Sequence, residues 1–225
     1  MSFIEDNIYN LTRKLPKNVN LVAVSKTHPV EMIKTAYSCG QRIFGENKVQ
    51  ELVSKYEELK QLNIKWHLIG HLQTNKVKYI VSFIDLIHSI DNLKLLKEID
   101  KQAKKNSKTI NCLLQFHIAT EETKFGLNYS EAEEILTSTD YKELKNINIC
   151  GVMGMASFTD NMDLVRKEFR NLKQIFEQLK KEYFATNFDF CEISMGMSSD
   201  WHIAVEEGST MIRVGSNIFG NRIYI

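Results

Sequence analysis

The sequence has few of the residues that break a chain into separate units. Only two prolines, Pro16 and Pro29, occur among 225 residues, and no stretch rich in glycine and serine divides the chain. Domain boundaries usually fall in such stretches. A chain of this length with 43% hydrophobic residues can bury one substantial core. We therefore expect residues 1–225 to form a single domain.

The chain also has no excess charge of either sign and no long apolar run. Its 29 lysine and arginine residues against 28 aspartate and glutamate residues leave a formal charge of +1, which argues against nucleic acid or an anionic membrane as partner. No run could cross a bilayer, and Glu5 and Asp6 lie where a secretory signal would be apolar. We expect a soluble protein of the cytoplasm whose partners are small molecules or proteins.

The four cysteines and the histidines predict neither disulfides nor a metal centre. No CxxC pair occurs, and the cysteines are widely spaced, at positions 39, 112, 150 and 191. His67 and His71 are four residues apart, but they follow a strand-like run, and nothing nearby supplies a third ligand. We expect reduced cysteines, structural histidines and no metal.

Short apolar runs alternate with longer stretches of helical period along the chain. Eight runs predict strands, at residues 21–25, 42–45, 64–69, 85–88, 112–118, 147–153, 188–193 and 211–214. Helices are predicted between them at 31–39, 49–61, 93–105, 130–138 and 162–183, and an opening helix carries Ile4, Ile8, Leu11 and Leu15 on one face. This alternation predicts an α/β protein, a single (β/α)8 TIM barrel with an additional N-terminal helix; an open doubly wound sheet is the alternative.

Lys26 lies at an unusual place for a charge. It follows the apolar run 21–25 and precedes Thr-His-Pro at 27–29, so it lies at the C-terminal tip of the first predicted strand. Because side chains alternate along a strand, Lys26 shares a face with Val22 and Val24. Burial lowers the pKa of a lysine amine, and a partly neutral amine forms a Schiff base with an aldehyde. A lysine whose stem runs along the strand end to water is the structural alternative.

Two loops rich in small residues follow the last two predicted strands. Residues 194–200 read Ser-Met-Gly-Met-Ser-Ser-Asp, and residues 214–217 read Val-Gly-Ser-Asn before a short helix that contains Ile218 and Phe219. In barrels of this type a phosphate site commonly forms after strands 7 and 8, where small residues let backbone N–H groups approach an anion. Tight turns with a helix cap are the structural alternative, but the position of both loops favours a phosphate site.

Arg213 lies inside the apolar run 210–214, where its charge needs an acceptor. A buried carboxylate such as Glu46 is one candidate acceptor, and a bound ligand is the other. A lysine for an aldehyde, two loops for a phosphate and a cation for a ring nitrogen together fit one cofactor, pyridoxal 5′-phosphate (PLP).

Seven short motifs lie in order along nearly the whole chain. They are AVSK at 23–26, FGEN at 44–47, WHLIGHLQ at 66–73, KFG at 124–126, GVM at 151–153, MGMS at 195–198 and GSTMIRVGS at 208–216. In these motifs the chain resembles the pyridoxal phosphate homeostasis proteins, a family of single-domain PLP-binding proteins. The resemblance implies a barrel like the N-terminal domain of alanine racemase (PLP fold type III), without the second, β-rich domain of that enzyme.

The resemblance also implies which residues bind the cofactor. Lys26 would hold PLP covalently as an internal aldimine. The side chain of Ser198, with the backbone of Gly215 and Ser216, would hold the phosphate.

Three further residues are implied for the ring of the cofactor. Arg213 would face the pyridine nitrogen, and Asn47 and Met153 would line the ring pocket. Asn47 also suits a second role, as the N-cap of the helix predicted to begin near residue 49.

Two features of the sequence argue against PLP catalysis. An arginine against the ring nitrogen keeps that nitrogen unprotonated, so the ring becomes a poorer electron sink. Racemisation needs a second acid/base, which alanine racemase reaches through its second domain, and Tyr37 and Tyr79 are predicted on helices outside the barrel. We therefore expect no catalytic residue.

The resemblance favours a non-catalytic protein of PLP homeostasis, a monomer or weak dimer that passes PLP to PLP-dependent apoenzymes. A weak PLP-dependent amino-acid racemase or decarboxylase is one alternative. A Schiff-base aldolase is another; its phosphate loops would hold substrate instead of cofactor.

Overall fold

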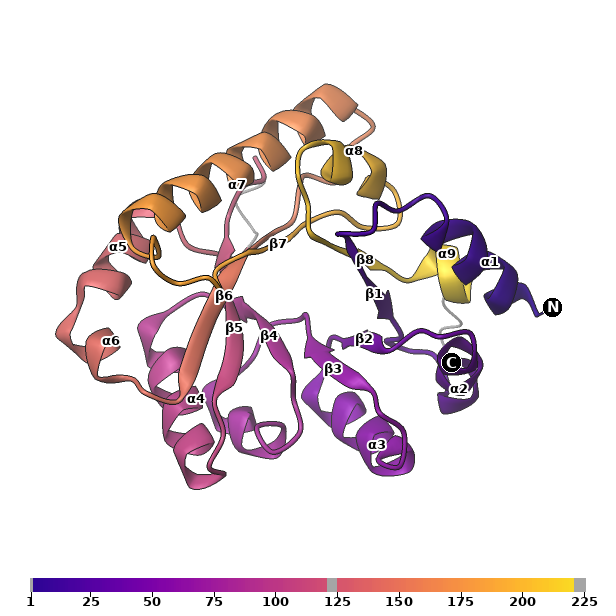
Figure 1. Ribbon diagram of the computed structural model, residues 1–225, viewed down its shortest axis with the longest axis horizontal. Coiled ribbons are helices and arrows are strands. Elements are labelled where there is room, and N and C mark those ends of the chain that lie inside the picture. Colours follow the sequence, from indigo (N-terminus) through magenta and orange to yellow (C-terminus); the bar gives the residue numbers. More distant parts are fainter. Residues whose placement is uncertain (1, 121–124, 221–225) are drawn as a thin grey trace.

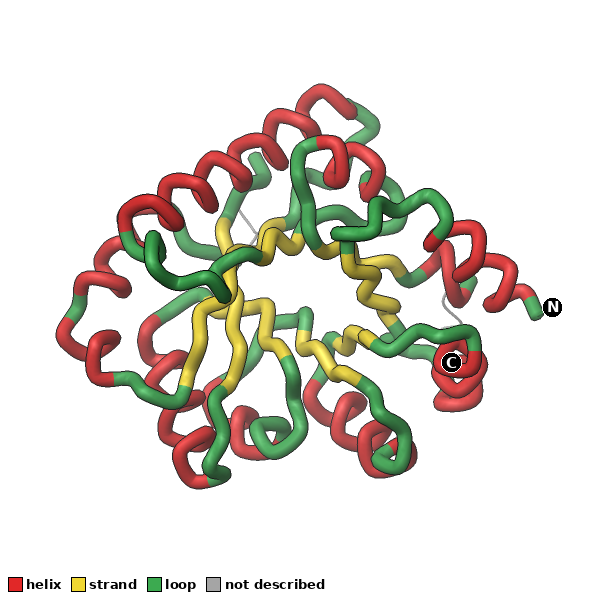
Figure 2. Tube along the Cα trace, viewed as in Figure 1, coloured by secondary structure: helices red, strands yellow, loops and turns green. Residues whose placement is uncertain are grey.

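The computed structural model describes residues 2–120 and 125–220; Lys124 of the KFG motif lies outside them. Eight parallel strands close into a barrel in chain order, and the first strand pairs with both the second and the eighth. Figures 1 and 2 show the ring of strands at the centre and the helices around it. The closed ring confirms the predicted (β/α)8 barrel and excludes the open doubly wound sheet.

The strands match the predicted runs with small shifts at their ends. They are β1 (Asn20–Val24), β2 (Ile43–Glu46), β3 (Lys65–Leu68), β4 (Leu86–Ile90), β5 (Ile110–Phe116), β6 (Ile147–Gly154), β7 (Glu192–Ser194) and β8 (Met211–Val214). The helices are α1 (Phe3–Thr12), α2 (Val30–Ser38), α3 (Val49–Leu59), the 3-10 helix η1 (Thr74–Tyr79), α4 (Leu93–Lys105), α5 (Tyr129–Thr137), α6 (Thr139–Glu143), α7 (Met162–Glu182), α8 (Trp201–Glu206) and α9 (Ser216–Phe219).

Strand β7 is shorter than its apolar run predicts. Phe188, expected at its start, is 92% exposed, and a turn is closed by the hydrogen bond from the N–H of Phe190 to the carbonyl of Asn187. The ring of Phe190 then stacks on Phe176 of α7 and on Phe184, at centroid distances of 5.0 and 4.1 Å. These aromatic residues pack between sheet and helix, so strand geometry begins only at Glu192.

The longer helices bury one apolar face, whereas the short helix α6 has no buried residue. In α7 the buried apolar residues recur at helical spacing, and Asn161 caps the first turn by accepting a hydrogen bond from the N–H of Leu164 at 3.1 Å. A capping box between Ser2 and Glu5 caps the N-terminus of the opening helix α1. The helix ends at Thr12, so Leu15 lies outside it. Among the described helices, none has both the length and the apolar composition that crossing a bilayer requires.

The core has two parts. The larger part fills the space between the sheet and the helices. A smaller apolar cluster fills the barrel itself, made by Val22, Leu86, Leu113, Cys150, Met153 and Met211. Because side chains alternate along each strand, one face of every strand supplies the outer core and the other points inward.

Candidate cofactor site

A cavity of about 350 Å³ opens at the C-terminal ends of the strands. This is the end at which (β/α)8 barrels place their reactive groups, and the volume suits a small molecule. Of the seven predicted site residues, the cavity is lined by Lys26, Asn47, Ser198, Arg213, Gly215 and Ser216. The structure thus brings together residues from both ends of the chain.

Met153 is not among the residues that line the cavity, contrary to the sequence-based expectation. Its side chain is 0% exposed and lies in the inner apolar cluster with Val22 and Met211. Strand β6 continues to Gly154, so the chain reaches the barrel mouth only at Met155, which does line the cavity. Sequence reasoning missed Met155, although it lies two residues further along.

Lys26 lies on the cavity wall as the alternation predicts. Val24 and Lys26 both line the cavity, whereas Val22 belongs to the inner cluster below them. Lys26 is part-buried, and Thr27, the next residue, has a backbone φ of 67°. This placement favours a role in the site over that of a lysine whose stem merely runs to water.

The two small-residue loops meet at the cavity. The N–H of Gly215 donates to Ser198 Oγ at 3.3 Å, and Asn217 Nδ2 donates to the carbonyl of Ser198 at 2.9 Å. Within the first loop, Asp200 Oδ1 accepts the N–H of Met197 at 2.5 Å. The two bonds of Ser198 join the loop after β7 to the loop after β8, the two loops between which (β/α)8 barrels commonly bind phosphate.

Gly196 allows the first loop to fold tightly against α8. It has a φ of +94°, and a Cβ there would lie 2.6 Å from Ala204 Cβ and 3.0 Å from Trp201 Cα. Only glycine meets both requirements, because other residues rarely adopt this φ and would clash with the helix.

Arg213 is 4% exposed and lies at the floor of the cavity. Its Nη1 donates to Ser194 Oγ at 2.7 Å and its Nη2 to the carbonyl of Gly154 at 3.0 Å. Burial lowers the pKa of Arg213 to about 10, although the charge of Asp200 acts in the opposite direction. Both acceptors are neutral, so the guanidinium suits an anionic or electron-rich ligand atom in the cavity.

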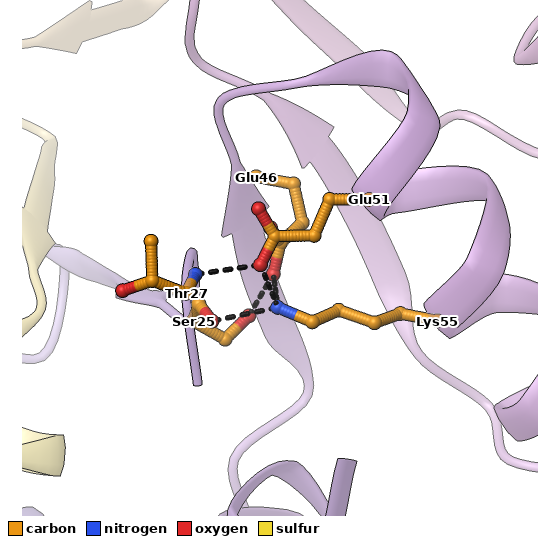
Figure 3. Close-up of polar contacts among 5 residues, drawn as sticks. All are labelled: Ser25, Thr27, Glu46, Glu51 and Lys55. Atoms are coloured by element: carbon orange, nitrogen blue, oxygen red, sulfur yellow. Dashed lines mark hydrogen bonds and ion pairs between the residues drawn. The ribbon is translucent and has the colours of Figure 1, made fainter. Parts of the chain in front are cut away.

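The sequence left Glu46 as a candidate acceptor for Arg213, but in the structure Glu46 bonds other residues. Its Oε1 accepts hydrogen bonds from Ser25 Oγ at 2.6 Å and from Lys55 Nζ at 2.8 Å. The side chain of Glu46 therefore points toward Lys55 of α3 (Figure 3). Arg213 lines the cavity inside the barrel, so Glu46 lies on the other face of the sheet.

A buried hydrogen-bond chain runs from Arg213 through the barrel interior. Ser194 Oγ lies 3.0 Å from His88 Nδ1, and His88 Nε2 lies 3.0 Å from His67 Nδ1. Arginine only donates, so the Ser194 hydroxyl accepts from it, and each of the two contacts of His88 holds one proton, because a neutral imidazole has one N–H and one bare nitrogen. Burial lowers the pKa of His67 to about 3 and that of His88 well below its ordinary value, so both rings are neutral.

The described residues contain no group of three histidine, cysteine, aspartate or glutamate side chains that could hold a metal ion. His67 instead lines a second cavity, at the N-terminal ends of the strands, and is bonded within the barrel. Sequence reasoning missed His88 and Ser194. A polar residue inside an apolar strand run was the available signal, as it was for Arg213.

Comparison with known proteins gives independent evidence on the family of this chain. The sequence matches the family model for the alanine racemase N-terminal domain over residues 1–222. A pyridoxal phosphate homeostasis protein from Aquifex aeolicus is 42% identical over 204 residues, which cover 91% of this chain and 87% of that protein. The chain belongs to the pyridoxal phosphate homeostasis protein family. A member from Haemophilus influenzae is 37% identical over 100% of this chain and 95% of its own length.

Solved structures extend the match to the fold of the family. PipY from Synechococcus elongatus PCC7942 without PLP has a TM-score of 0.90 and 36% identity, covering 96% of this chain and 100% of its own. PipY with PLP bound has a TM-score of 0.87 and 35% identity over the same 96% of this chain. An alanine racemase from Clostridium difficile 630 shares the fold alone, with a TM-score of 0.78, 15% identity and coverage of 97% of this chain but 59% of that one.

In this member of the pyridoxal phosphate homeostasis family, Asn47 lines the cavity and does not cap α3. The N-cap of α3 is Lys48, so the second role considered for Asn47 is wrong. Gly70, at the tip of β3, makes room for Asn47, because a Cβ on Gly70 would lie 2.4 Å from the Asn47 carbonyl oxygen and 2.9 Å from its Oδ1. Gly70 belongs to the motif at 66–73, but the sequence alone did not show that this glycine makes room for Asn47.

Proposed function

We propose that this protein binds PLP in the cavity at the C-terminal mouth of the barrel and takes part in PLP homeostasis. The observation that carries the proposal is that Lys26, Arg213 and the two joined small-residue loops line one cavity of about 350 Å³. A primary amine, a cation and an anion-binding wall match the aldehyde, the ring nitrogen and the phosphate of one molecule. The PLP-bound structure of PipY and the names of the relatives support it.

Each lining residue has one task in this proposal. Lys26 would hold the cofactor covalently through its amine, which would condense with the aldehyde with loss of one water. Ser198, Gly215 and Ser216 bind the phosphate, while Asn47 borders the ring.

Arg213 keeps the ring nitrogen unprotonated, because two positive charges in contact are costly. PLP, when bound, supplies an electron-withdrawing ring, and an unprotonated nitrogen weakens that property. Ser194 and the Gly154 carbonyl hold the guanidinium without supplying a negative charge.

We infer a role in holding and delivering PLP, not in amino-acid turnover. The relatives are named for homeostasis, and Arg213 opposes the electron-sink chemistry that turnover needs. Tyr37 packs against Arg42 on the outer side of the barrel and Tyr79 is half exposed on η1, so neither serves the cavity as an acid/base. PLP-dependent apoenzymes are the proposed recipients.

The test is the absorption spectrum of the purified protein with PLP added, followed by borohydride reduction and peptide mapping. We expect a visible band that reduction abolishes and an added mass on the peptide that contains Lys26. Lys26→Ala should lose the band and the adduct, whereas Lys48→Ala, an exposed lysine near the same barrel end, should keep both.

Ser198→Ala should keep the band but release PLP about tenfold more readily, because one phosphate contact is lost. An unchanged spectrum in Lys26→Ala would refute the proposed site. A colourless protein that cleaves a sugar phosphate would favour the aldolase. Deuterium exchange at the Cα of an added amino acid would favour the racemase or decarboxylase.

A further inference from the structure

Both residues that flank Lys26 are held by charged side chains from neighbouring elements (Figure 3). Lys55 Nζ of α3 donates to the Ser25 carbonyl at 2.7 Å, and Ser25 Oγ donates to Glu46 Oε1 at 2.6 Å. On the other side, the N–H of Thr27 donates to Glu51 Oε1 of α3 at 2.6 Å. We call Ser25, Thr27, Glu46, Glu51 and Lys55 the Lys55 cluster.

Lys55 is the centre of this cluster. Lys55 is only 5% exposed. Besides donating to the Ser25 carbonyl, its Nζ contacts Glu46 Oε1 at 2.8 Å and Glu51 Oε1 at 2.7 Å. The three acceptors match the three N–H donors of a lysine ammonium. Hydrogen bonds between charged groups are short and directional, and removing one partner from a buried pair leaves an uncompensated charge. The cluster therefore fixes β1, β2 and α3 to one another beside Lys26.

The backbone at Lys26 needs such support. The N–H of His28 donates to the Ser25 carbonyl at 3.0 Å, so residues 25–28 form a tight turn with Lys26 and Thr27 at its centre. Thr27 has a φ of 67°, which a β-branched residue rarely adopts. Such a conformation persists only where surrounding contacts hold it, and the bond from Thr27 to Glu51 is one of these contacts.

We propose that Glu51, Lys55 and Glu46 are positioning residues, which hold the strained turn at 25–28 in the conformation that directs Lys26 into the cavity. The proposal rests on the proposed function, since it assigns these residues to the reaction of Lys26 with an aldehyde. None of the three lines the cavity, so they act through the turn. A well-held amine reacts faster because its productive geometry is already formed.

The test compares rates of adduct formation in Glu51→Ala and Glu57→Ala. Both residues lie on α3, and Glu57 is an exposed carboxylate that pairs only with Lys60 among the described residues. After mixing with PLP, we expect the visible band to rise about tenfold more slowly in Glu51→Ala, and at the wild-type rate in Glu57→Ala. Glu51→Gln, whose amide oxygen still accepts from Thr27 but lacks the charge, should fall between them.

A second substitution separates positioning from general loss of stability. Glycine adopts positive φ without strain, so in Thr27→Gly the turn at 25–28 no longer depends on the hydrogen bond to Glu51 to keep its conformation. The double variant Thr27→Gly/Glu51→Ala should recover to within about threefold of the wild-type rate, although it restores no contact to α3. If general weakening were the cause, the rates of the variants would follow their free energies of unfolding, which urea unfolding measures on the same proteins.

Three outcomes decide the proposal. The wild-type protein must first form the Lys26 adduct; without it the proposed function fails, and the role of the cluster fails with it. If the wild type forms the adduct and both Glu51 variants, folded by circular dichroism, react at the wild-type rate, only the positioning role is overturned. It is also overturned if the double variant stays as slow as Glu51→Ala.

Discussion

Glu46 shows how one buried carboxylate responds to its surroundings. Its Oε1 has two hydrogen-bond donors, while among the described residues its buried Oε2 has none. Burial raises the pKa of Glu46 from 4.5 to about 6, and Lys55 and Ser25 only partly oppose this. The carboxylate thus costs folding free energy when it is ionised, even inside the Lys55 cluster.

This shift predicts a pH dependence of stability. The folded state holds the Glu46 proton more tightly than the unfolded state does, so the contribution of Glu46 is fully present below pH 4.5 and is lost as pH rises through about 6. The free energy of unfolding should fall by about 2 kcal/mol over this range from Glu46 alone. Urea unfolding from pH 4 to 7 measures this as a difference between two proteins: the free energy of unfolding of the wild type should fall by this amount relative to Glu46→Gln, because the buried neutral histidines His67 and His88 act on both proteins alike.

The control for this measurement is Glu57→Gln, because Glu57 is exposed on α3. It should have the same pH profile as the wild type. A Glu46→Gln profile that keeps the wild-type slope would contradict the assignment of the slope to Glu46.

At the scale of elements, the loop after β7 depends on a close approach to α8. Gly196 and Gly40 have the same φ of +94°, but a Cβ on Gly196 would meet Ala204 and Trp201, whereas a Cβ on Gly40 would have no described atom within 4 Å. The two glycines therefore separate the cost of backbone conformation from the cost of a clash.

Gly40→Ala should lose about 1 kcal/mol of unfolding free energy, the cost of a left-handed alanine. Gly196→Ala should lose about 1–3 kcal/mol more, because the clash displaces the loop, and it should also weaken retention of PLP. Urea unfolding and ultrafiltration with PLP measure the two effects. Equal stabilities for the two variants would show that the loop tolerates the extra methyl group.

At the scale of the whole molecule, the row of hydrogen bonds from Arg213 through Ser194 and His88 to His67 connects the two ends of the barrel. Arg213 lines the cavity at the C-terminal ends of the strands and His67 lines the cavity at the N-terminal ends. Every residue between them is neutral and buried, so the orientation of Arg213 depends on hydrogen bonds that cross the core.

Ser194→Ala should therefore loosen the cofactor site from within the barrel. It leaves a buried Arg213 donor and His88 Nδ1 without their shared partner, at a cost of about 1–3 kcal/mol, and PLP retention should fall several-fold. Ser209→Ala is the matched control, since Ser209 is also buried but within residues 2–120 and 125–220 bonds only backbone carbonyls, those of Ile193, Met195 and Met211. It should lower the unfolding free energy and leave PLP retention unchanged.

The quaternary state stays a prediction. Among the described residues, exposed phenylalanines lie at both ends of the barrel: Phe158 borders the cavity at one end and Phe188 the cavity at the other. A dispersed distribution fits the expected monomer or weak dimer better than a large obligate interface. Sedimentation velocity over a range of protein concentrations measures it.

The sequence was sufficient to predict the barrel and most residues of its mouth. Buried strands and amphipathic helices are local patterns, so eight alternating units could be recognised one at a time. The same holds for Lys26, Ser198, Gly215 and Ser216, which follow a strand, and for Arg213, which lies one residue before the end of β8, so that all five lie near the mouth once the ring closes.

Only the tertiary structure decided which polar groups meet and which side chains reach the mouth of the barrel. Glu46 bonds Lys55 and not Arg213, and Met155 reaches the mouth where Met153 does not, because these outcomes depend on which face of a strand points inward and where the strand ends. His88 and Ser194 are 106 positions apart in the chain, yet they share a hydrogen bond in the barrel. Local patterns decide secondary structure, whereas a contact between distant residues exists only after all eight strands have taken their register.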